Sequence, residues 1–199
     1  VGDTLTYTTS LSDNSALPSW LSFNGLARTF SGTPRNDEVG DIEVTVIATD
    51  AAGATASDTF MTTVTNVNDI PTVANAITDK SVFEDSVLSF LFNNNVFEDV
   101  DVGDTLTYTA TLLDGSTLPT WLAFDGTTQA FTGIPLNGDI GTITIKITAT
   151  DTSNISVFDT FDLDVANIND APTVENPIAD GKISQNATLS FQFNTNVFD

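Results

Sequence analysis

The 199-residue chain carries 27 acidic and 5 basic side chains, has a net charge of -22, and contains no cysteine and no histidine. This charge argues against nucleic acid or an anionic membrane as a partner, because both are bound through basic patches. Without cysteine and histidine the chain cannot form disulfides, thiolate or histidine metal sites, or Ser-His-Asp triads.

The sequence repeats itself with a period of 101 residues and without a gap. The opening phrase VGDTLTYT returns at residues 102–109, and later phrases recur at the same offset. These pairs are ALPSWLSF and TLPTWLAF, FSGTP and FTGIP, VTVIATD and IKITATD, NVNDIPTV and NINDAPTV, and LSFLFNNNVFE and LSFQFNTNVFD. The repeat predicts tandem units of similar structure.

Each repeat has the pattern of β-strands. Stretches such as TLTYTATLL and TITIKITAT alternate with a period of two and are rich in Thr, Val and Ile. In chain order, the complete repeat predicts about seven strands, at residues 72–77, 86–92, 105–113, 118–124, 129–132, 141–150 and 155–165. This number of short strands in about 100 residues predicts an all-β, immunoglobulin-like sandwich. We expect Trp20 and Trp121 in the cores, with sugar stacking as the alternative role.

The NxND-x-P phrase marks the expected junction between units, because its proline ends the strand pattern. Residues 1–69 are therefore expected to be a unit that lacks its first strands, and residues 70–170 a complete unit. Residues 171–199 are expected to be the opening strands of a third unit. Because Val1 is not an initiator methionine, we expect the chain to be an excerpt from a longer one.

Acidic side chains recur at fixed places in the repeat: after the opening strand, in the phrase FEDVDVGD, at the end of a long strand, and at the junction. In a sandwich whose strands run end to end, these places gather at the poles, where close carboxylates repel one another. A divalent cation with six to eight oxygen ligands removes that cost, and carboxylates, amides and carbonyls suit Ca²⁺. The alternative is that the acids only keep the poles solvated.

The combination of AxD, NxND-x-P and DxDxGDxLxY resembles the cadherin-like modules of the dystroglycan type, which are common in bacterial surface proteins. The resemblance covers essentially the whole chain. It implies tandem cadherin-like, immunoglobulin-like sandwiches with Ca²⁺ between consecutive modules.

The resemblance implies a set of calcium ligands at each junction. The first set takes one side chain of the first unit, Asn36 or Asp37, and otherwise consists of Asn66, Asn68, Asp69, Asp99, Asp101, Asp104 and Asp151. The second set consists of Glu84, Asn137 or Asp139, Asn167, Asn169 and Asp170.

The sequence departs from cadherins at both linkers, where Asn replaces the first Asp and where Ile70 and Ala171 replace the last Asn. The Leu-Asp-Arg-Glu motif of cadherins is also absent. Fewer charged ligands predict weak binding, with a dissociation constant on the order of 10⁻⁴–10⁻³ M.

The expected function is structural. The chain would be a repeat of a long secreted or cell-surface protein, bacterial as its resemblance implies, that forms a rod or fibre stiffened by Ca²⁺ and serves adhesion or filament formation. Its lack of cysteine fits a rod stabilised by ions instead of disulfides. The alternative is a carbohydrate-binding module. An enzyme is not expected, because repeated acids single out no acid–nucleophile pair of the kind that glycosidases use.

The last residues, 171–199, carry apolar side chains that they cannot bury alone, among them Ile183, Leu189 and Phe191. Either a longer chain continues them, or they complete the first unit of another copy by strand donation, which would join copies head to tail in a filament. The expected partners are thus neighbouring units of the same or another copy, with a polysaccharide or cell-surface ligand as a further candidate.

Overall fold

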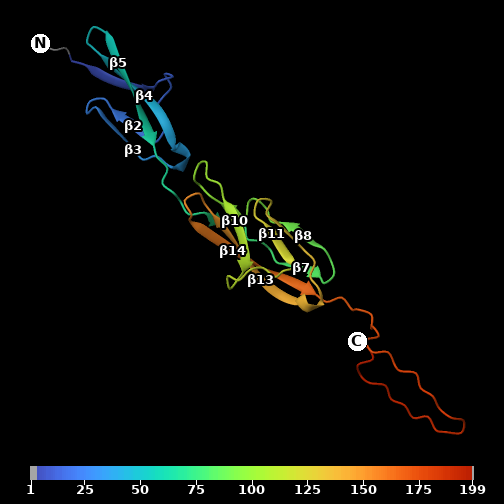
Figure 1. Ribbon diagram of the computed structural model, residues 1–199. Coiled ribbons are helices and arrows are strands. Elements are labelled where there is room, and N and C mark those ends of the chain that lie inside the picture. Colours follow the sequence, from blue (N-terminus) through green and yellow to red (C-terminus); the bar gives the residue numbers. More distant parts are fainter. Residues whose placement is uncertain (1–3, 199) are drawn as a thin grey trace.

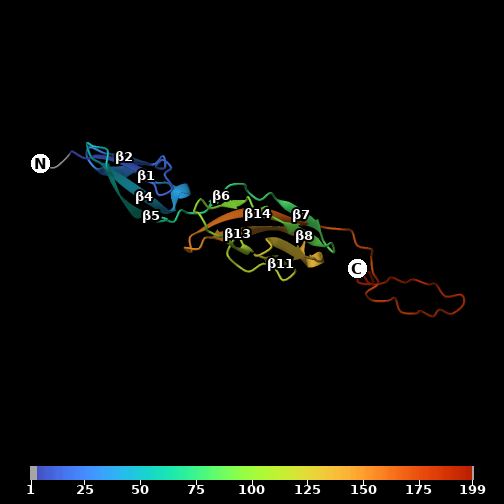
Figure 2. The ribbon, with the colours of Figure 1, turned by 90° about the horizontal axis from the view of Figure 1, so that it is seen from above.

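The computed structural model describes residues 4–198, which form two β units followed by an extended tail (Figures 1 and 2). Residues 1–3 and 199, at the ends of the predicted first and third units, lie outside the described residues. Between residues 4 and 198 the only helices are two short 3₁₀ turns, η1 (Asn36–Glu38) and η2 (Asn137–Asp139). The all-β prediction is confirmed. No helix in this part of the chain is long and apolar enough to cross a membrane.

The first unit consists of strands β1 to β5 in two sheets. An antiparallel sheet of order β1-β4-β5 joins β1 (Thr6–Leu11), β4 (Gly40–Thr49) and β5 (Thr55–Val64). The other sheet is a hairpin of β2 (Leu21–Asn24) and β3 (Thr29–Gly32).

The second unit consists of strands β6 to β14. Its two main sheets correspond to the two sheets of the first unit, but each has one more strand. One sheet has the order β10-β13-β14-β7, from β10 (Thr107–Leu112), β13 (Gly141–Thr150), β14 (Ser156–Ala166) and β7 (Lys80–Phe83). The other has the order β11-β12-β8, from β11 (Leu122–Asp125), β12 (Ala130–Gly133) and β8 (Leu88–Leu91). A small pair joins β6 (Thr72–Val73) to β9 (Phe97–Glu98).

The core of the second unit lies between its two sheets. Ile145, Ile147 and Ala149 on β13 are fully buried, because alternate side chains of a strand point to the same face. Phe131 on β12 stacks on Phe90 of β8, with ring centroids 5.0 Å apart, and meets Phe161 of β14 edge-on at 5.8 Å. Aromatic rings therefore bind the two sheets together.

Both tryptophans are partly buried, and Trp121 packs against the core of the second unit. The glycines that end β3 and β12 explain why the phrases around the tryptophans repeat. A Cβ on Gly133 would overlap the backbone carbonyl oxygen of Trp121, and one on Gly32 would overlap that of Trp20. The backbone at each tryptophan, directly before β2 or β11, thus passes so close to the end of β3 or β12 that only glycine fits there.

The seven predicted strands are present, that at 141–150 with the predicted limits and the others with different ones, and two further strands occur. Residues 118–121 are not strand, because Leu122 N–H closes a turn onto the carbonyl of Pro119. The predicted strand at 72–77 is reduced to β6. Strands β7 and β9 were not predicted. The pattern of β7 is too short to show a period, and its partner is the distant β14, to which it pairs in parallel. The two residues of β9 are a strand only because they pair with β6.

The tail, residues 171–198, runs away from the second unit and doubles back on itself (Figures 1 and 2). Its residues are exposed except Val197. A single antiparallel bridge joins Val174 to Phe198.

The core makes a testable prediction about Phe131, which is fully buried. Phe131→Ala is expected to lower the free energy of unfolding of the second unit by about 3–5 kcal/mol, since it leaves a cavity between the sheets. Phe158→Ala is the matched control, because Phe158 lies on β14 with 58 % of its surface exposed and contacts Lys146. Its expected cost is below about 1 kcal/mol. Urea unfolding followed by Trp fluorescence measures both, and equal losses would contradict this assignment of the core.

Candidate metal centre

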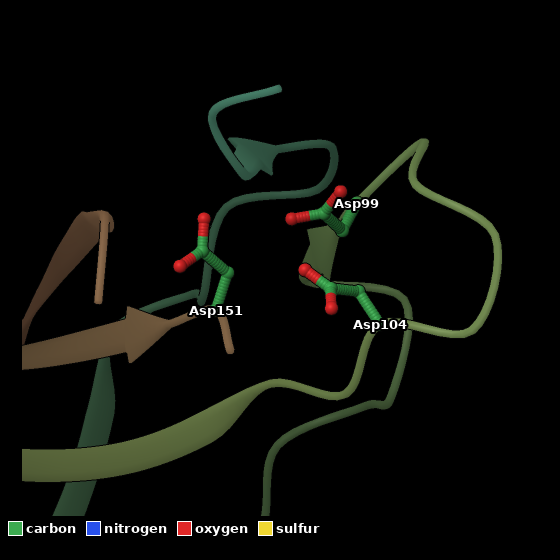
Figure 3. Close-up of side chains that lie close together, drawn as sticks. All are labelled: Asp99, Asp104 and Asp151. Carbon is green, nitrogen blue, oxygen red and sulfur yellow. The ribbon is translucent and has the colours of Figure 1, made fainter. Parts of the chain in front are cut away.

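Three carboxylates converge at the end of the second unit that lies beside the linker (Figure 3). Asp99 and Asp104 belong to the loop between β9 and β10, and Asp151 directly follows β13. One oxygen atom of each carboxylate lies within 4.8 Å of the other two. The structure therefore brings together three side chains of the first predicted ligand set.

Local turns hold these carboxylates in place. Asp99 Oδ1 accepts a hydrogen bond from the backbone N–H of Asp101 at 2.9 Å, which closes an Asx turn. Asp151 Oδ1 accepts one from the N–H of Ile155 at 2.7 Å, across the turn that leads into β14. The hydroxyl of Thr152 donates to Asp104 Oδ1. Thr152 was not predicted, although its place directly after the AxD phrase is a signal that could have found it.

The linker, residues 65–71, is bonded to this cluster and to the first unit. Asn68 Nδ2 donates to Asp151 Oδ2 at 3.0 Å, and the N–H of Asp69 donates to Asp101 Oδ2 at 2.7 Å. On the other side, the amide of Asn36 in η1 donates to Asp69 Oδ2 at 2.6 Å. A chain of hydrogen bonds therefore runs from the first unit through Asp69 to the acidic end of the second.

Several carboxylate oxygens in the cluster lack partners. Asp101 and Asp151 expose only 5 % and 4 % of their surface. Within residues 4–198, Asp99 Oδ2, Asp101 Oδ1 and Asp104 Oδ2 are inaccessible and accept no hydrogen bond. Desolvated anionic oxygens without partners cost several kcal/mol of folding free energy. The arrangement fits a hard cation with oxygen ligands, and Ca²⁺ prefers this donor set.

Three basic side chains lie over aromatic rings and not at the acidic cluster. Arg28 lies over the ring of Tyr7, Lys80 over Phe90 and Lys146 over Phe158, at 6.0, 5.7 and 5.8 Å from the ring centroids. These three cations therefore do not compensate the acidic cluster.

Asp151 is held in its ionised form. Burial raises the pKa of Asp151, but hydrogen bonds from Asn68 and from the N–H groups of Ile155 and Ser153 lower it, and the net pKa lies below the ordinary value. The carboxylate is thus negatively charged at neutral pH, as a metal ligand must be.

The opposite pole of the second unit repeats part of this arrangement. Glu84 is fully buried, and its Oε1 accepts a hydrogen bond from the N–H of Ile168 at 2.7 Å. Asn167, with its amide nitrogen turned toward Glu84, donates to the same oxygen at 2.9 Å. Among the described residues, Glu84 Oε2 has no partner. This pole therefore also holds a buried anionic oxygen without compensation.

The second linker is held as the first is. Asn137 in η2 donates to Asp170 Oδ2 at 2.7 Å, as Asn36 does to Asp69, and Asn169 Nδ2 donates to the carbonyl of Asp170 at 3.0 Å. The sequence left open the choice between Asn36 and Asp37 and that between Asn137 and Asp139. In both cases the asparagine is the residue that bonds the linker.

Three other predicted ligands lie apart from the cluster, and a fourth lies beside it. Asp139 caps its own turn by accepting from the N–H of Leu136 at 2.9 Å, and Asp37 is exposed on η1. Asn66 is exposed in the linker, and within residues 4–198 no hydrogen bond joins its side chain to the carboxylates. Asp101 lies beside the three converging carboxylates and bonds the linker.

Comparison with protein families and curated proteins found related sequences. The family model described as "Putative Ig domain" (He_PIG) matches residues 1–65 and 70–166. The "Serine-rich adhesin for platelets" of Staphylococcus aureus strain USA300 is 32 % identical over 149 residues, which are 75 % of this chain. The protein of the same name from strain MRSA252 is equally similar. The chain spans only 6 % and 10 % of the length of these two relatives.

Two solved structures share the fold. Human mucin-like protocadherin EC1-2 has a TM-score of 0.59 at 18 % identity, over 82 % of this chain and 85 % of that one. Mouse cadherin-23 EC22-24 has a TM-score of 0.57 at 20 % identity, over 87 % of this chain and 57 % of that one. The predicted immunoglobulin-like and cadherin-like sandwich is thereby confirmed.

The bond between Asn68 and Asp151 makes a prediction about pH. In a chelator, Asn68→Ala is expected to raise the pKa of Asp151, because it removes a hydrogen bond to the ionised form while burial remains. A lowered pKa adds stability above the unfolded value of about 3.9, and this contribution is lost as the pH falls through the folded value.

Carboxyl NMR titration of the full chain measures this pKa. Asn66→Ala is the control, since Asn66 is an exposed linker residue without a bond to Asp151. An unchanged pKa in Asn68→Ala would show that the bond to Asp151 does not form in solution.

Proposed function

This chain belongs to the family described as "Putative Ig domain", and we propose that it is a structural, adhesion-type repeat of an extracellular protein, in which Ca²⁺ holds neighbouring units in one orientation. The proposal includes the finer assignment to cadherin-like modules of the dystroglycan type. It also includes the division into a first module at residues 1–69, a complete module at 70–170 and the opening strands of a third at 171–199.

The observation that carries the proposal is the set of unpartnered carboxylate oxygens at the joint between the units. A structural fold gains nothing from burying anions beside one another, since each loses hydration and repels its neighbours. A bound Ca²⁺ offsets both costs, because it takes six to eight oxygen ligands and carries the opposite charge.

Ca²⁺ at this place would connect parts of the chain that otherwise meet only through hydrogen bonds. Asp99, Asp104 and Asp151 would hold the ion from the second unit, with the free oxygen of Asp101 beside them. Asn68 and the N–H of Asp69 already donate hydrogen bonds to Asp151 and Asp101. The carboxylate of Asp69 accepts one from Asn36 of the first unit. Fixing the linker therefore fixes the direction of one unit against the next, which turns a flexible string into a rod.

The extracellular setting and the adhesive role rest on the relatives. The staphylococcal proteins of both strains are named as an adhesin for platelets. We take from them a surface location and a role in adhesion, with neighbouring units as the immediate partners. The same relatives favour a structural domain over an enzyme.

The carbohydrate-binding alternative receives no support from the tryptophans. Trp121 packs partly buried against the core, and Trp20 occupies the equivalent place in the first unit. A sugar-stacking platform needs an aromatic face that is open to solvent.

The calcium site predicts a stability difference. Ca²⁺ at ten times its dissociation constant is expected to raise the free energy of unfolding by about 1.4 kcal/mol over that in chelator, because it binds only the folded chain. Asp99→Asn should remove most of this gain. Asp162→Asn should keep it, since Asp162 has the same charge but lies exposed on β14, bonded to Thr144. Melting curves measure the difference, and equal curves in chelator and in 10 mM Ca²⁺ (roughly ten times the expected constant) would refute the site.

Glu84 offers a second test at the opposite pole. In chelator, Glu84→Gln is expected to be neutral or stabilising, because it removes a buried charge whose Oε2 lacks a partner. In Ca²⁺ the same variant should lose part of the calcium-dependent gain. Asp85→Asn, at the exposed neighbouring position, is the control. An equal destabilisation by Glu84→Gln with and without Ca²⁺ would assign Glu84 a purely structural role.

A further inference from the structure

A pocket of about 980 Å³ lies in the second unit, between β10 of one sheet and the turn that joins β11 to β12 of the other. The loop between β8 and β9 also contributes to it. Hydroxyl and amide side chains dominate the lining, which includes Asn94, Thr105, Tyr108, Thr127, Thr128 and Gln129. The volume is at the upper end of the range of about 300–1,000 Å³ that is usual for small-molecule sites.

The turn between β11 and β12 is fixed against β10. Asp125 Oδ1 accepts hydrogen bonds from the N–H groups of Thr127 at 2.9 Å and Thr128 at 3.4 Å, which close the turn. A Cβ on Gly126 would overlap the backbone carbonyl oxygen of Tyr108, so only glycine lets the turn and the strand come this close. Two walls of the pocket are therefore preorganised, which lowers the entropic cost of binding a ligand between them.

Tyr108 is held in the β10 wall by two aromatic neighbours. The centroid of its ring lies 5.5 Å from that of Phe92 and 5.9 Å from that of Phe97. Burial raises the pKa of Tyr108, and a hydrogen bond with the side chain of Gln129 lowers it, with a net pKa above the ordinary value. The hydroxyl is therefore neutral at physiological pH, and it can both donate and accept a hydrogen bond.

The lining of the pocket is uncharged. Within residues 4–198, none of its side chains is acidic or basic, although the chain carries 27 acidic groups. A charged ligand would lose hydration here without meeting an opposite charge. An apolar ligand would cover the amides of Asn94 and Gln129 and deprive them of hydrogen-bond partners, which costs binding free energy. The lining therefore matches a ligand that is neutral and rich in hydroxyl groups.

We propose that this pocket binds a neutral oligosaccharide. Sugar hydroxyls donate and accept hydrogen bonds, so they can pair with the threonine hydroxyls and with both atoms of each amide. The ring of Tyr108 offers an apolar surface to the C–H groups of a sugar, and its hydroxyl offers a polar tip. This binding activity goes beyond the proposed structural role, and it depends neither on the tryptophans nor on the calcium site.

The first unit has a pocket at the equivalent place with a different lining. It measures about 790 Å³ and contains Tyr7 and Arg28 where the second unit has Tyr108 and Gln129. Arg28 has a φ of 56° and Gln129 a φ of 57°, so the two turns share this left-handed backbone conformation. The guanidinium of Arg28 lies over the ring of Tyr7, which gives this pocket a charge and covers its aromatic surface. We therefore expect one sugar site per chain, in the second unit.

The first test compares glycans that differ in charge. An array of immobilised neutral oligosaccharides, each paired with its sialylated or sulfated form, is probed with the full chain. It is probed in chelator and again in Ca²⁺, because Asp104 of the acidic cluster directly precedes Thr105. We expect binding to a neutral glycan and at least about tenfold weaker binding to its anionic form. No binding to any neutral glycan in either condition, or a preference for the anionic forms, would overturn the proposal.

The second test locates the site with variants, using calorimetric titration of the neutral glycan that the array selects. Gln129→Arg copies the residue that the first unit carries at this turn position, so the fold accommodates it. It is expected to weaken binding at least about tenfold, because it removes an amide and places a cation over Tyr108. Asn94→Ala, at an exposed position, should weaken binding about three- to tenfold.

Phe158→Ala is the control, because it removes an exposed aromatic ring that does not line the pocket. It should bind the glycan as the wild-type chain does, and unchanged melting curves show that all three variants fold. Wild-type affinity in both Gln129→Arg and Asn94→Ala, or a loss of binding in Phe158→Ala alone, would refute the pocket as the site.

Discussion

The arrangement of this molecule depends on burying carboxylates where two units meet. Asp101 and Asp151 are almost inaccessible, and the linker is tied to both of them through Asp69 and Asn68. Burial makes each anionic oxygen costly unless it is compensated, and hydrogen bonds compensate only some of them. The joint is therefore the place where a cation, as the proposed function requires, would offset the largest cost of burial.

The second constraint is that a sandwich needs both sheets to be complete. In the second unit, β7 and β8 close the edges of β14 and β12, and Phe131 and Phe161 are buried as a result. In the first unit, within residues 4–198, no strand pairs with the same edges, and Phe60 is partly exposed although its sequence context is nearly the same. Burial here is thus a property of the assembled strands and not of the residue alone.

Local pattern was sufficient for the long strands. The alternation in β13 predicted its limits, because one face of the strand enters the core and the other meets water. It failed for β7, whose place depends on a parallel partner far along the chain. Within the site, the grouping of Asp99, Asp104 and Asp151 followed from their places at strand ends. The choice of Asn137 over Asp139 did not, because it depends on which side chain of the turn faces the linker.

The sequence by itself determined the all-β class, the repeat and the places where acids gather, because each of these is written in residue types and their spacing. Only the tertiary structure decided which carboxylate oxygens within residues 4–198 are left without partners, that Thr152 donates to Asp104, and that β7 pairs with β14. The physical reason is that desolvation and strand pairing depend on contacts between residues distant in the chain. No local pattern of residues contains those contacts.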